Sequence, residues 1–192
     1  MMLSIIIPVF NEEKTIISVL NSIKKNLENK LKYEIVVIND GSTDGTGKLL
    51  EENKNLFNEL IINETNQGKG YSVKKGLNKC SGTHITFQDA DLEYNPADLL
   101  KIEKIFTDFD ADGVIGSRFN YSDYTRTHNL LNKIGNKILT LIFNILYNTT
   151  FTDIYSCYFA FKKDFINPAN LKVNGFAQHA EILTKVISKG SK

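Results

Sequence analysis

Apolar runs alternate with helically spaced apolar positions through the first two thirds of the chain. Short, continuous apolar runs are typical of strands that are buried on both faces of a parallel sheet. The predicted strands are residues 3–9, 34–38, 60–62, 84–87 and 113–116. The segments between them predict helices over residues 13–27, 46–57, 69–78 and 96–106. This alternation is typical of βαβ units, so we expect an α/β fold with a mostly parallel sheet flanked by helices on both faces.

The pattern changes after Arg118. The remaining segments predict a polar loop over residues 120–128, a helix that includes 130–146, a strand through 157–161 and a last helix over 178–188. The first of these two helices carries a broad stripe of Leu and Ile, and we expect it to be a well-buried core helix. A helix lying on a membrane or on another part of the protein is the alternative, and only Lys133 and Lys137 support a basic face. The longest apolar stretch, residues 138–147, is shorter than the ~20 residues that span a bilayer.

Composition narrows the functional classes. The chain has 192 residues, which fits one domain, and its net charge of +1 gives no bulk attraction to nucleic acid. We therefore expect no nucleic-acid partner. The two cysteines, Cys80 and Cys157, lack the spacing of a metal site or a disulfide framework, and the N-terminal apolar run is too short for a signal peptide. These features favour buried thiols in a reducing, cytoplasmic location.

Two carboxylates, Asp89 and Asp91, follow the fourth predicted strand with one small residue between them. Hard cations take oxygen ligands, and Mg2+ usually binds one or two carboxylates together with substrate phosphates. The pair therefore favours an enzyme that handles nucleotides, although an Asp-rich loop that caps the helix at Pro96 is the alternative. Ligands of open α/β sheets bind outside the carboxyl ends of strands, so we expect the pair to converge with residues 11–12 and 39–40.

Six short motifs occur in an order that is more specific than any one of them. They are PVFNE (8–12), NDGSTDGT (39–46), NQGKG (66–70), DADLE (89–93, with Pro96), GSR (116–118) and DIYS (153–156). In this order they resemble the motifs of the family 2 glycosyltransferases, which have the Rossmann-like GT-A fold. The resemblance is greatest to the branch that transfers mannose or glucose to dolichyl and other polyprenyl phosphates. The chain departs from residues common in the family at four positions: Phe10, Asn39, Glu93 and Cys157.

The resemblance implies several groups of site residues. Those expected to bind the nucleotide are Pro8, Phe10, Asn11, Glu12, Asn39, Asp40, Lys69, Asp89 and Ala90. Those expected to hold a divalent cation, Mg2+ or Mn2+, are Asp89, Asp91 and Glu93. The only two arginines of the chain, Arg118 and Arg126, are expected to bind the phosphate of the acceptor, because guanidinium groups meet phosphate oxygens in pairs. Asp91 and Asp153 are the catalytic candidates, and for Asp153 a general base and a turn cap both stay open.

The function implied by the resemblance is metal-dependent, inverting transfer of a sugar from a nucleoside-diphosphate sugar to a polyprenyl phosphate. Two alternatives stay open: transfer to a saccharide hydroxyl in cell-surface polysaccharide synthesis, and a non-catalytic nucleotide-sugar-binding domain. Residues 1–118 are expected to bind the nucleotide sugar and residues 119–192 to face the acceptor, within one catalytic domain that is truncated at its C-terminus. We expect a cytoplasmic protein, peripheral at the membrane face, and a homo-oligomer stays open.

Overall fold

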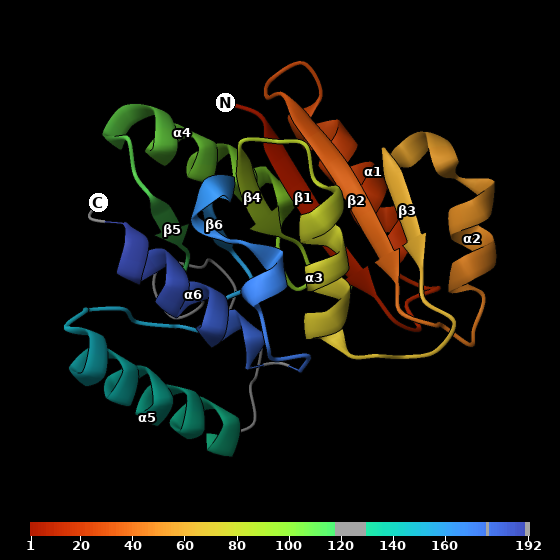
Figure 1. Cartoon of the computed structure of the whole chain (residues 1–192). Coiled ribbons are helices and arrows are strands. Elements are labelled where there is room, and N and C mark those ends of the chain that lie inside the picture. The colour runs from red at the N-terminus through yellow and green to blue at the C-terminus, as the bar shows by residue number, and fades with distance from the viewer. Residues whose placement is uncertain (118–129, 176, 191–192) are drawn as a thin grey trace.

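The computed structural model describes residues 1–117, 130–175 and 177–190, and its strands form one six-stranded sheet in the order β3-β2-β1-β4-β6-β5 (Figure 1). The strands are β1 (Leu3–Val9), β2 (Tyr33–Asn39), β3 (Glu59–Ile62), β4 (His84–Phe87), β5 (Gly113–Ile115) and β6 (Phe159–Lys162). β3, β2, β1 and β4 are parallel neighbours, whereas β6 is antiparallel to both β4 and β5. The predicted α/β class with a mostly parallel sheet is therefore confirmed. The insertion of β6 between β4 and β5 has no signature in the order of elements along the chain.

Helices cover both faces of the sheet, as predicted. They are α1 (Ile16–Leu27), α2 (Thr46–Glu52), α3 (Lys69–Lys79), α4 (Leu99–Phe109), α5 (Leu130–Tyr147) and α6 (Gln178–Lys189). Successive side chains of a strand point to opposite faces. Accordingly, Ile5 and Ile7 of β1 belong to a buried cluster with residues of α1 and α4, while Ile6 belongs to a second cluster with residues of α3 and α6. Figure 1 shows α3 in front of the sheet and α1 behind it.

Two predicted helices contain 3-10 turns. The segment predicted over residues 46–57 divides into α2 and a 3-10 turn at Lys54–Leu56, and the segment from residue 96 begins with a 3-10 turn at Pro96–Asp98 before α4. The side-chain oxygen of Asn95 accepts a hydrogen bond from the Ala97 N–H at 3.1 Å. This cap, with a proline at the first position, fixes the start of the helix as the sequence predicted.

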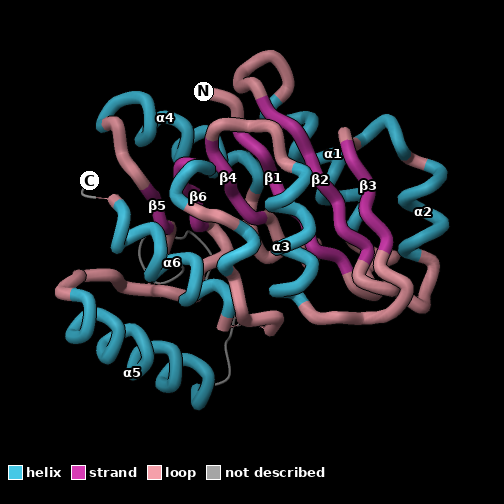
Figure 2. The backbone as a smooth tube through the Cα atoms, in the orientation of Figure 1, coloured by secondary structure: helices cyan, strands magenta, loops and turns pink. Residues whose placement is uncertain are grey.

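Helix α5 is not the buried core helix that the sequence predicted. Figure 2 shows it at the edge of the molecule. Thr140 and Phe143 are buried, but Leu131 and Ile145 are 74% and 72% exposed. The prediction was wrong because a stripe of apolar residues shows that a helix has two faces, and does not show which of them meets the protein. Among the helices that the structure describes, none is both long enough and apolar enough to cross a bilayer.

Candidate functional site

The sheet places three polar loops at one edge. The strand order reverses between β1 and β4, with β2 on the other side of β1, and all three strands run in the same direction. Their carboxyl ends therefore lead residues 10–15, 40–46 and 88–95 to the same end of the sheet. In open α/β sheets, a reversal of this kind is the usual place for a ligand crevice. The predicted convergence of the loops is thus a consequence of the observed topology.

The loop after β1 is bound to the loop after β2. The N–H of Asn11 donates to the Ser42 hydroxyl at 3.0 Å, and the Thr43 N–H donates to the Asn11 side-chain oxygen at 2.8 Å. The Glu12 N–H donates to the Thr46 hydroxyl at 2.9 Å. Asn11 has a φ of 56°, a left-handed conformation that Asn tolerates better than most residues. These contacts show that Asn11 and its neighbours fix the spacing of the two loops.

Asp40 organises the third side of the crevice. Its carboxylate is buried and accepts hydrogen bonds from the Asn63 side-chain amide at 2.6 Å, the Gln67 N–H at 3.0 Å and the Gly68 N–H at 2.9 Å. Gly41 follows with a φ of +68°, and a Cβ there would lie 2.5 Å from the Thr65 carbonyl carbon. The geometry therefore gives Asp40 the role of holding the loop before α3, and its predicted contact with a nucleotide stays a prediction.

The remaining nucleotide candidates on β1 and β2 differ in exposure. Phe10 is 43% exposed directly beyond the end of β1, so its ring can present a face to a base. Pro8 is half-buried within β1. Asn39 is buried, and its side-chain oxygen accepts a hydrogen bond from the Ser42 N–H at 3.0 Å. An amide at position 39 thus supports the turn through its neutral oxygen.

Lys69 and Asp89 form an ion pair inside the crevice. Lys69 is the first residue of α3, and its Nζ lies 2.5 Å from Asp89 Oδ1. Both side chains are about one-third exposed or less. Burial alone would lower the pKa of Lys69, but the negative charge of Asp89 raises it above its ordinary value. The pair therefore brings a positive charge next to Asp89, the carboxylate that the sequence assigned to both nucleotide and metal binding. Ala90, the next residue, is buried.

The predicted metal ligands are only partly brought together. Asp91 is half-buried and its Oδ1 accepts the Glu93 N–H at 2.9 Å. Among the residues that the structure describes, no group of three His, Cys, Asp or Glu side chains is arranged to hold a metal ion. The structure therefore does not gather Asp89, Asp91 and Glu93 into a three-carboxylate site. The two aspartates still offer hard oxygen donors on one short loop, which fits Mg2+ or Mn2+ when phosphate oxygens fill further positions.

Residues from the C-terminal part close the crevice behind Asp89. A cavity of about 60 Å³ is lined by Lys69, Gly70, Val73, Phe87, Asp89, Tyr155, Cys157, Gly175, Gln178, His179 and Ile182. Burial raises the pKa of the Cys157 thiol well above its ordinary value, and the negative charge of Asp89 raises it further, so the thiol is neutral. The buried Gln178 Nε2 has no hydrogen-bond partner among the described residues. Sequence reasoning missed Gln178 and His179, whose only signal is their position at the start of the last predicted helix.

Asp153 is buried beneath α5. Its Oδ1 accepts hydrogen bonds from the Asn136 side-chain amide at 2.8 Å and from the Tyr155 N–H at 3.2 Å. The second bond closes the side-chain turn that Asp commonly forms two residues before its donor. This geometry favours the turn cap among the two roles that the sequence left open, and Asp153 as a general base stays a prediction. Arg118 and Arg126 lie outside the described residues.

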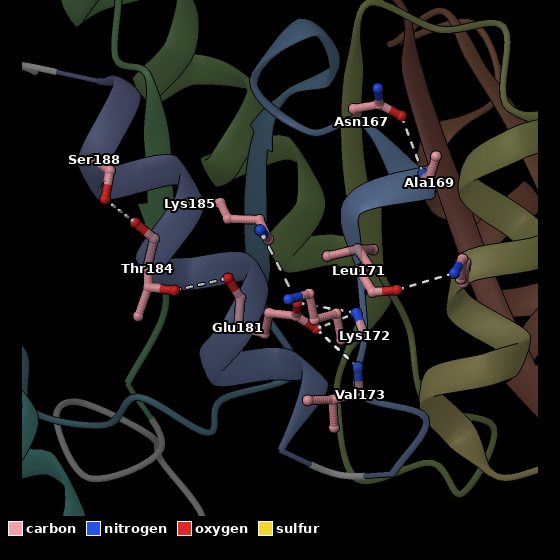
Figure 3. A network of polar contacts seen from close by, with 10 residues as sticks. Asn167, Ala169, Leu171, Lys172, Val173, Glu181, Thr184, Lys185 and Ser188 are labelled. Atoms are coloured by element: carbon pink, nitrogen blue, oxygen red, sulfur yellow. Dashed lines mark hydrogen bonds and ion pairs between the residues drawn. The ribbon is translucent and has the colours of Figure 1, made fainter.

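Glu181 of α6 supports the segment that packs on α3 (Figure 3). Its carboxylate accepts the Lys172 N–H at 3.0 Å and the Val173 N–H at 3.1 Å. The next residue, Asn174, accepts the Tyr71 N–H through its carbonyl at 3.1 Å. A Cβ at Gly70 would lie 2.6 Å from that same carbonyl, so glycine is required for the close approach. Glu181 thus holds the neighbour of Lys69 in place through the backbone.

Comparisons with known proteins find a matching family model and similar sequences. The family described as Glycosyl transferase family 2 matches residues 4–167. The chain is 34% identical over 199 residues to the uncharacterized protein MJ0544 of Methanocaldococcus jannaschii, which covers 97% of this chain and 82% of that protein. It is 28% identical over 188 residues to the dolichol-phosphate mannosyltransferase of Pyrococcus furiosus, covering 96% of this chain and 53% of that protein.

A solved structure supports the expected GT-A fold. It is the glucosyl-3-phosphoglycerate synthase of Mycobacterium tuberculosis, in complex with Mn2+, uridine diphosphate and glucosyl-3-phosphoglycerate. The TM-score is 0.74 at 19% identity, over 98% of this chain and 66% of that chain. At this identity the likeness concerns the fold alone. It confirms the fold expected from the motifs.

Proposed function

Because the chain belongs to glycosyl transferase family 2, we propose that it transfers a sugar, with inversion and with the help of a divalent cation, from a nucleoside-diphosphate sugar to a polyprenyl phosphate. The observation that carries this proposal is the Lys69–Asp89 ion pair at the strand-order reversal between β1 and β4. The pair places an ammonium group and a carboxylate at the edge of the sheet where ligands of open α/β sheets bind. The similarity to a dolichol-phosphate mannosyltransferase supports a lipid phosphate as the acceptor.

The residues of the crevice suit a nucleoside diphosphate. The exposed ring of Phe10 offers a stacking surface for the base, and the loops fixed by Asn11 and Asp40 set the space around the ribose. Lys69 places its ammonium where it can contact a diphosphate oxygen, as a charge-assisted hydrogen bond. A divalent cation held by Asp89 and Asp91 would offset the charge that gathers on the leaving diphosphate.

A phosphate acceptor is consistent with the hydrogen bonds that Asp153 makes in the structure. In an inverting transfer, the acceptor oxygen attacks the anomeric carbon from the side opposite the diphosphate, and the bond to the diphosphate breaks as the new bond forms. A phosphate oxygen is already ionised at neutral pH, so it needs no strong general base. The buried Asp153 carboxylate, which is engaged by Asn136 and the Tyr155 N–H, is consistent with a reaction in which it removes no proton. A lipid acceptor also implies that the protein works at a membrane surface.

Calorimetric titration tests the donor half of this proposal. The full chain is titrated with UDP-, GDP- and CDP-sugars, with and without Mn2+, alongside Asp91→Asn. We expect metal-dependent binding of at least one nucleotide sugar and loss of the metal-dependent part in the variant, because Asp91 supplies one of the two carboxylates. The matched control is Asp108→Asn, which changes an exposed aspartate on α4 paired with Lys104. Binding that is unaffected by the metal and by Asp91→Asn would contradict the proposed metal site.

A further inference from the structure

Helix α5 presents its polar side chains to the protein. The Asn136 amide donates to Asp153, and the Asn144 amide donates to the Phe151 carbonyl at 2.8 Å while its oxygen accepts the Phe151 N–H at 3.0 Å. Thr140, one turn from Asn136, is buried on the same side. In an ordinary surface helix the apolar side faces the core. The inner face of α5 is instead attached to the domain by these hydrogen bonds together with the buried ring of Phe143, which packs near Phe151.

The opposite face of α5 is apolar and exposed. Its exposed aliphatic side chains are Leu131, Ile134, Ile138, Leu139, Leu141, Ile142, Ile145 and Leu146. Leu131 at 74% and Leu146 at 72% exposure lie near opposite ends of the helix, so the apolar face extends along its length. A contiguous apolar surface of this kind marks a site of interaction with a membrane or a partner.

The charges of α5 favour an anionic surface. Residues 130–147 contain Lys133 and Lys137 and no acidic residue, and both lysines are exposed. At ~100° per residue, Lys137 and Lys133 lie roughly 80° and 120° around the helix from Ile145. Lys137 therefore borders the apolar face on one flank, and Lys133 lies farther round the helix on the same flank. A long lysine stem can lie along apolar surface while its ammonium reaches lipid headgroups.

We propose that the exposed face of α5, from Leu131 to Leu146, docks the protein on an anionic lipid bilayer, with the helix axis in the plane of the membrane. A helix with one polar and one apolar face lies in the headgroup region, and attraction of basic residues to anionic lipid adds to burial of the apolar side chains. This inference deepens the proposed function and rests on it for its biological purpose, since a lipid-linked acceptor is reached from a membrane surface.

A second copy of the chain fits this face less well than a bilayer. Cores of protein–protein interfaces are enriched in aromatic residues, Met and Arg and depleted in Lys. The exposed face of α5 is instead formed by Leu and Ile, with lysines on one flank and a single exposed aromatic residue, Tyr147, at the end of the helix. The helix is ~27 Å long and its apolar face ~10 Å wide, a footprint of roughly 300 Å². A standard interface buries about 800 Å² on each partner.

The inner face of α5 connects the docking surface to the crevice. Asn136 holds Asp153, and Asp153 fixes the turn that leads to Tyr155. Tyr155 and Cys157, farther along the same segment, line the cavity beside Asp89. The helix that meets the bilayer is thus bonded to the segment that closes the crevice, so docking orients the crevice relative to the membrane surface.

Vesicle co-sedimentation tests this inference without acceptor or nucleotide. The full chain is mixed with vesicles of phosphatidylcholine alone or of phosphatidylcholine with phosphatidylglycerol. We expect binding to the mixed vesicles that weakens at least ~10-fold in the double variant Leu141→Asn, Ile145→Asn, because two side chains no longer favour burial. The matched control, Ile62→Asn with Phe109→Asn, removes exposed apolar side chains from β3 and α4 and should bind like the wild type.

Replacing the two lysines of α5 gives an independent test of the same inference. Lys133→Gln with Lys137→Gln should weaken binding to the mixed vesicles roughly 30-fold and leave binding to phosphatidylcholine vesicles unchanged. Vesicle binding that is equal for the wild type and both α5 variants would overturn the proposal. So would a wild type that binds no vesicles and forms a dimer, in sedimentation velocity, that Leu141→Asn with Ile145→Asn dissociates. If vesicle binding follows the expected pattern but no nucleotide sugar binds any of the proteins, the docking surface is supported and the proposed function is contradicted.

Discussion

Replacing Asp40 by Asn separates two roles for this residue. The carboxylate accepts three hydrogen bonds, from the Asn63 side chain and from the Gln67 and Gly68 N–H groups. In Asp40→Asn one oxygen becomes an NH2 group that faces a donor, and the remaining bonds lose their charge. A hydrogen bond to a charged group contributes about 1.5–3 kcal/mol. The neutral side chain of the variant costs less to bury than the carboxylate, which offsets part of this loss. We therefore expect a net loss of about 2–4 kcal/mol of unfolding free energy.

The loss is measured by urea unfolding and by the thermal midpoint. For a chain of this size each kcal/mol lowers the midpoint by ~2–4 °C, so the expected fall is roughly 5–15 °C. Asp108→Asn, in the exposed pair with Lys104, should cost no more than ~1 kcal/mol. A stability change below ~0.5 kcal/mol, together with loss of nucleotide binding, would refute the positioning role. That result would place Asp40 in contact with the nucleotide, as the sequence motif implied.

Two further predictions concern Lys69, a charged residue of the crevice, and Glu34, a buried carboxylate of β2. Lys69→Gln should weaken binding of a nucleoside diphosphate ~10-fold or more while leaving binding of the matching nucleoside unchanged, because it removes a charge-assisted contact to phosphate. Calorimetry of both ligands checks this, with Lys48→Gln, a change of an exposed lysine, as the control. An equal loss of affinity for both ligands would count against a contact between Lys69 and the diphosphate. Burial alone would raise the pKa of Glu34, but hydrogen bonds from Ser4, Ser81 and Gly82 lower it below its ordinary 4.5. The stability that the ionised Glu34 contributes is therefore present above pH 4.5 and is lost as the pH falls through its lowered pKa. Urea unfolding should show Glu34→Gln to be about 1–2 kcal/mol less stable than the wild type at neutral pH, with the difference vanishing in acid; a difference that does not change with pH would contradict this.

The parallel half of the fold was predictable from the sequence. Strands β1, β2 and β4 are short apolar runs, which are typical of strands buried on both faces of a parallel sheet. The bounds predicted for β4 are those that the structure shows. The place of β6 was not predictable, because it depends on a pairing between Ala160 and residues far apart in the chain, Thr86 and Val114. Alternation along a chain fixes the class of a sheet better than the order of its last strands.

The site was predictable in part. The Asp89 loop and Lys69 carry recognisable motifs, and the structure pairs them. The buried position of Asp40 was not predictable, since a motif does not show whether a carboxylate faces a ligand or its own backbone. The orientation of α5 depends on partners such as Asp153 and Phe151, which give its polar residues hydrogen bonds and leave its apolar face exposed.

Transfer of labelled sugar to a polyprenyl phosphate is the direct test of the proposed function. The full chain is incubated with undecaprenyl phosphate in vesicles, Mn2+ and each nucleotide sugar that it binds, and the lipid product is examined by proton spectroscopy of its anomeric position. The proposed function predicts a lipid-linked sugar of inverted anomeric configuration, formed by the wild type and Asp108→Asn and lost in Asp91→Asn. A protein that binds the donor with the metal but transfers the sugar only to saccharide hydroxyls, or to no acceptor, would contradict it.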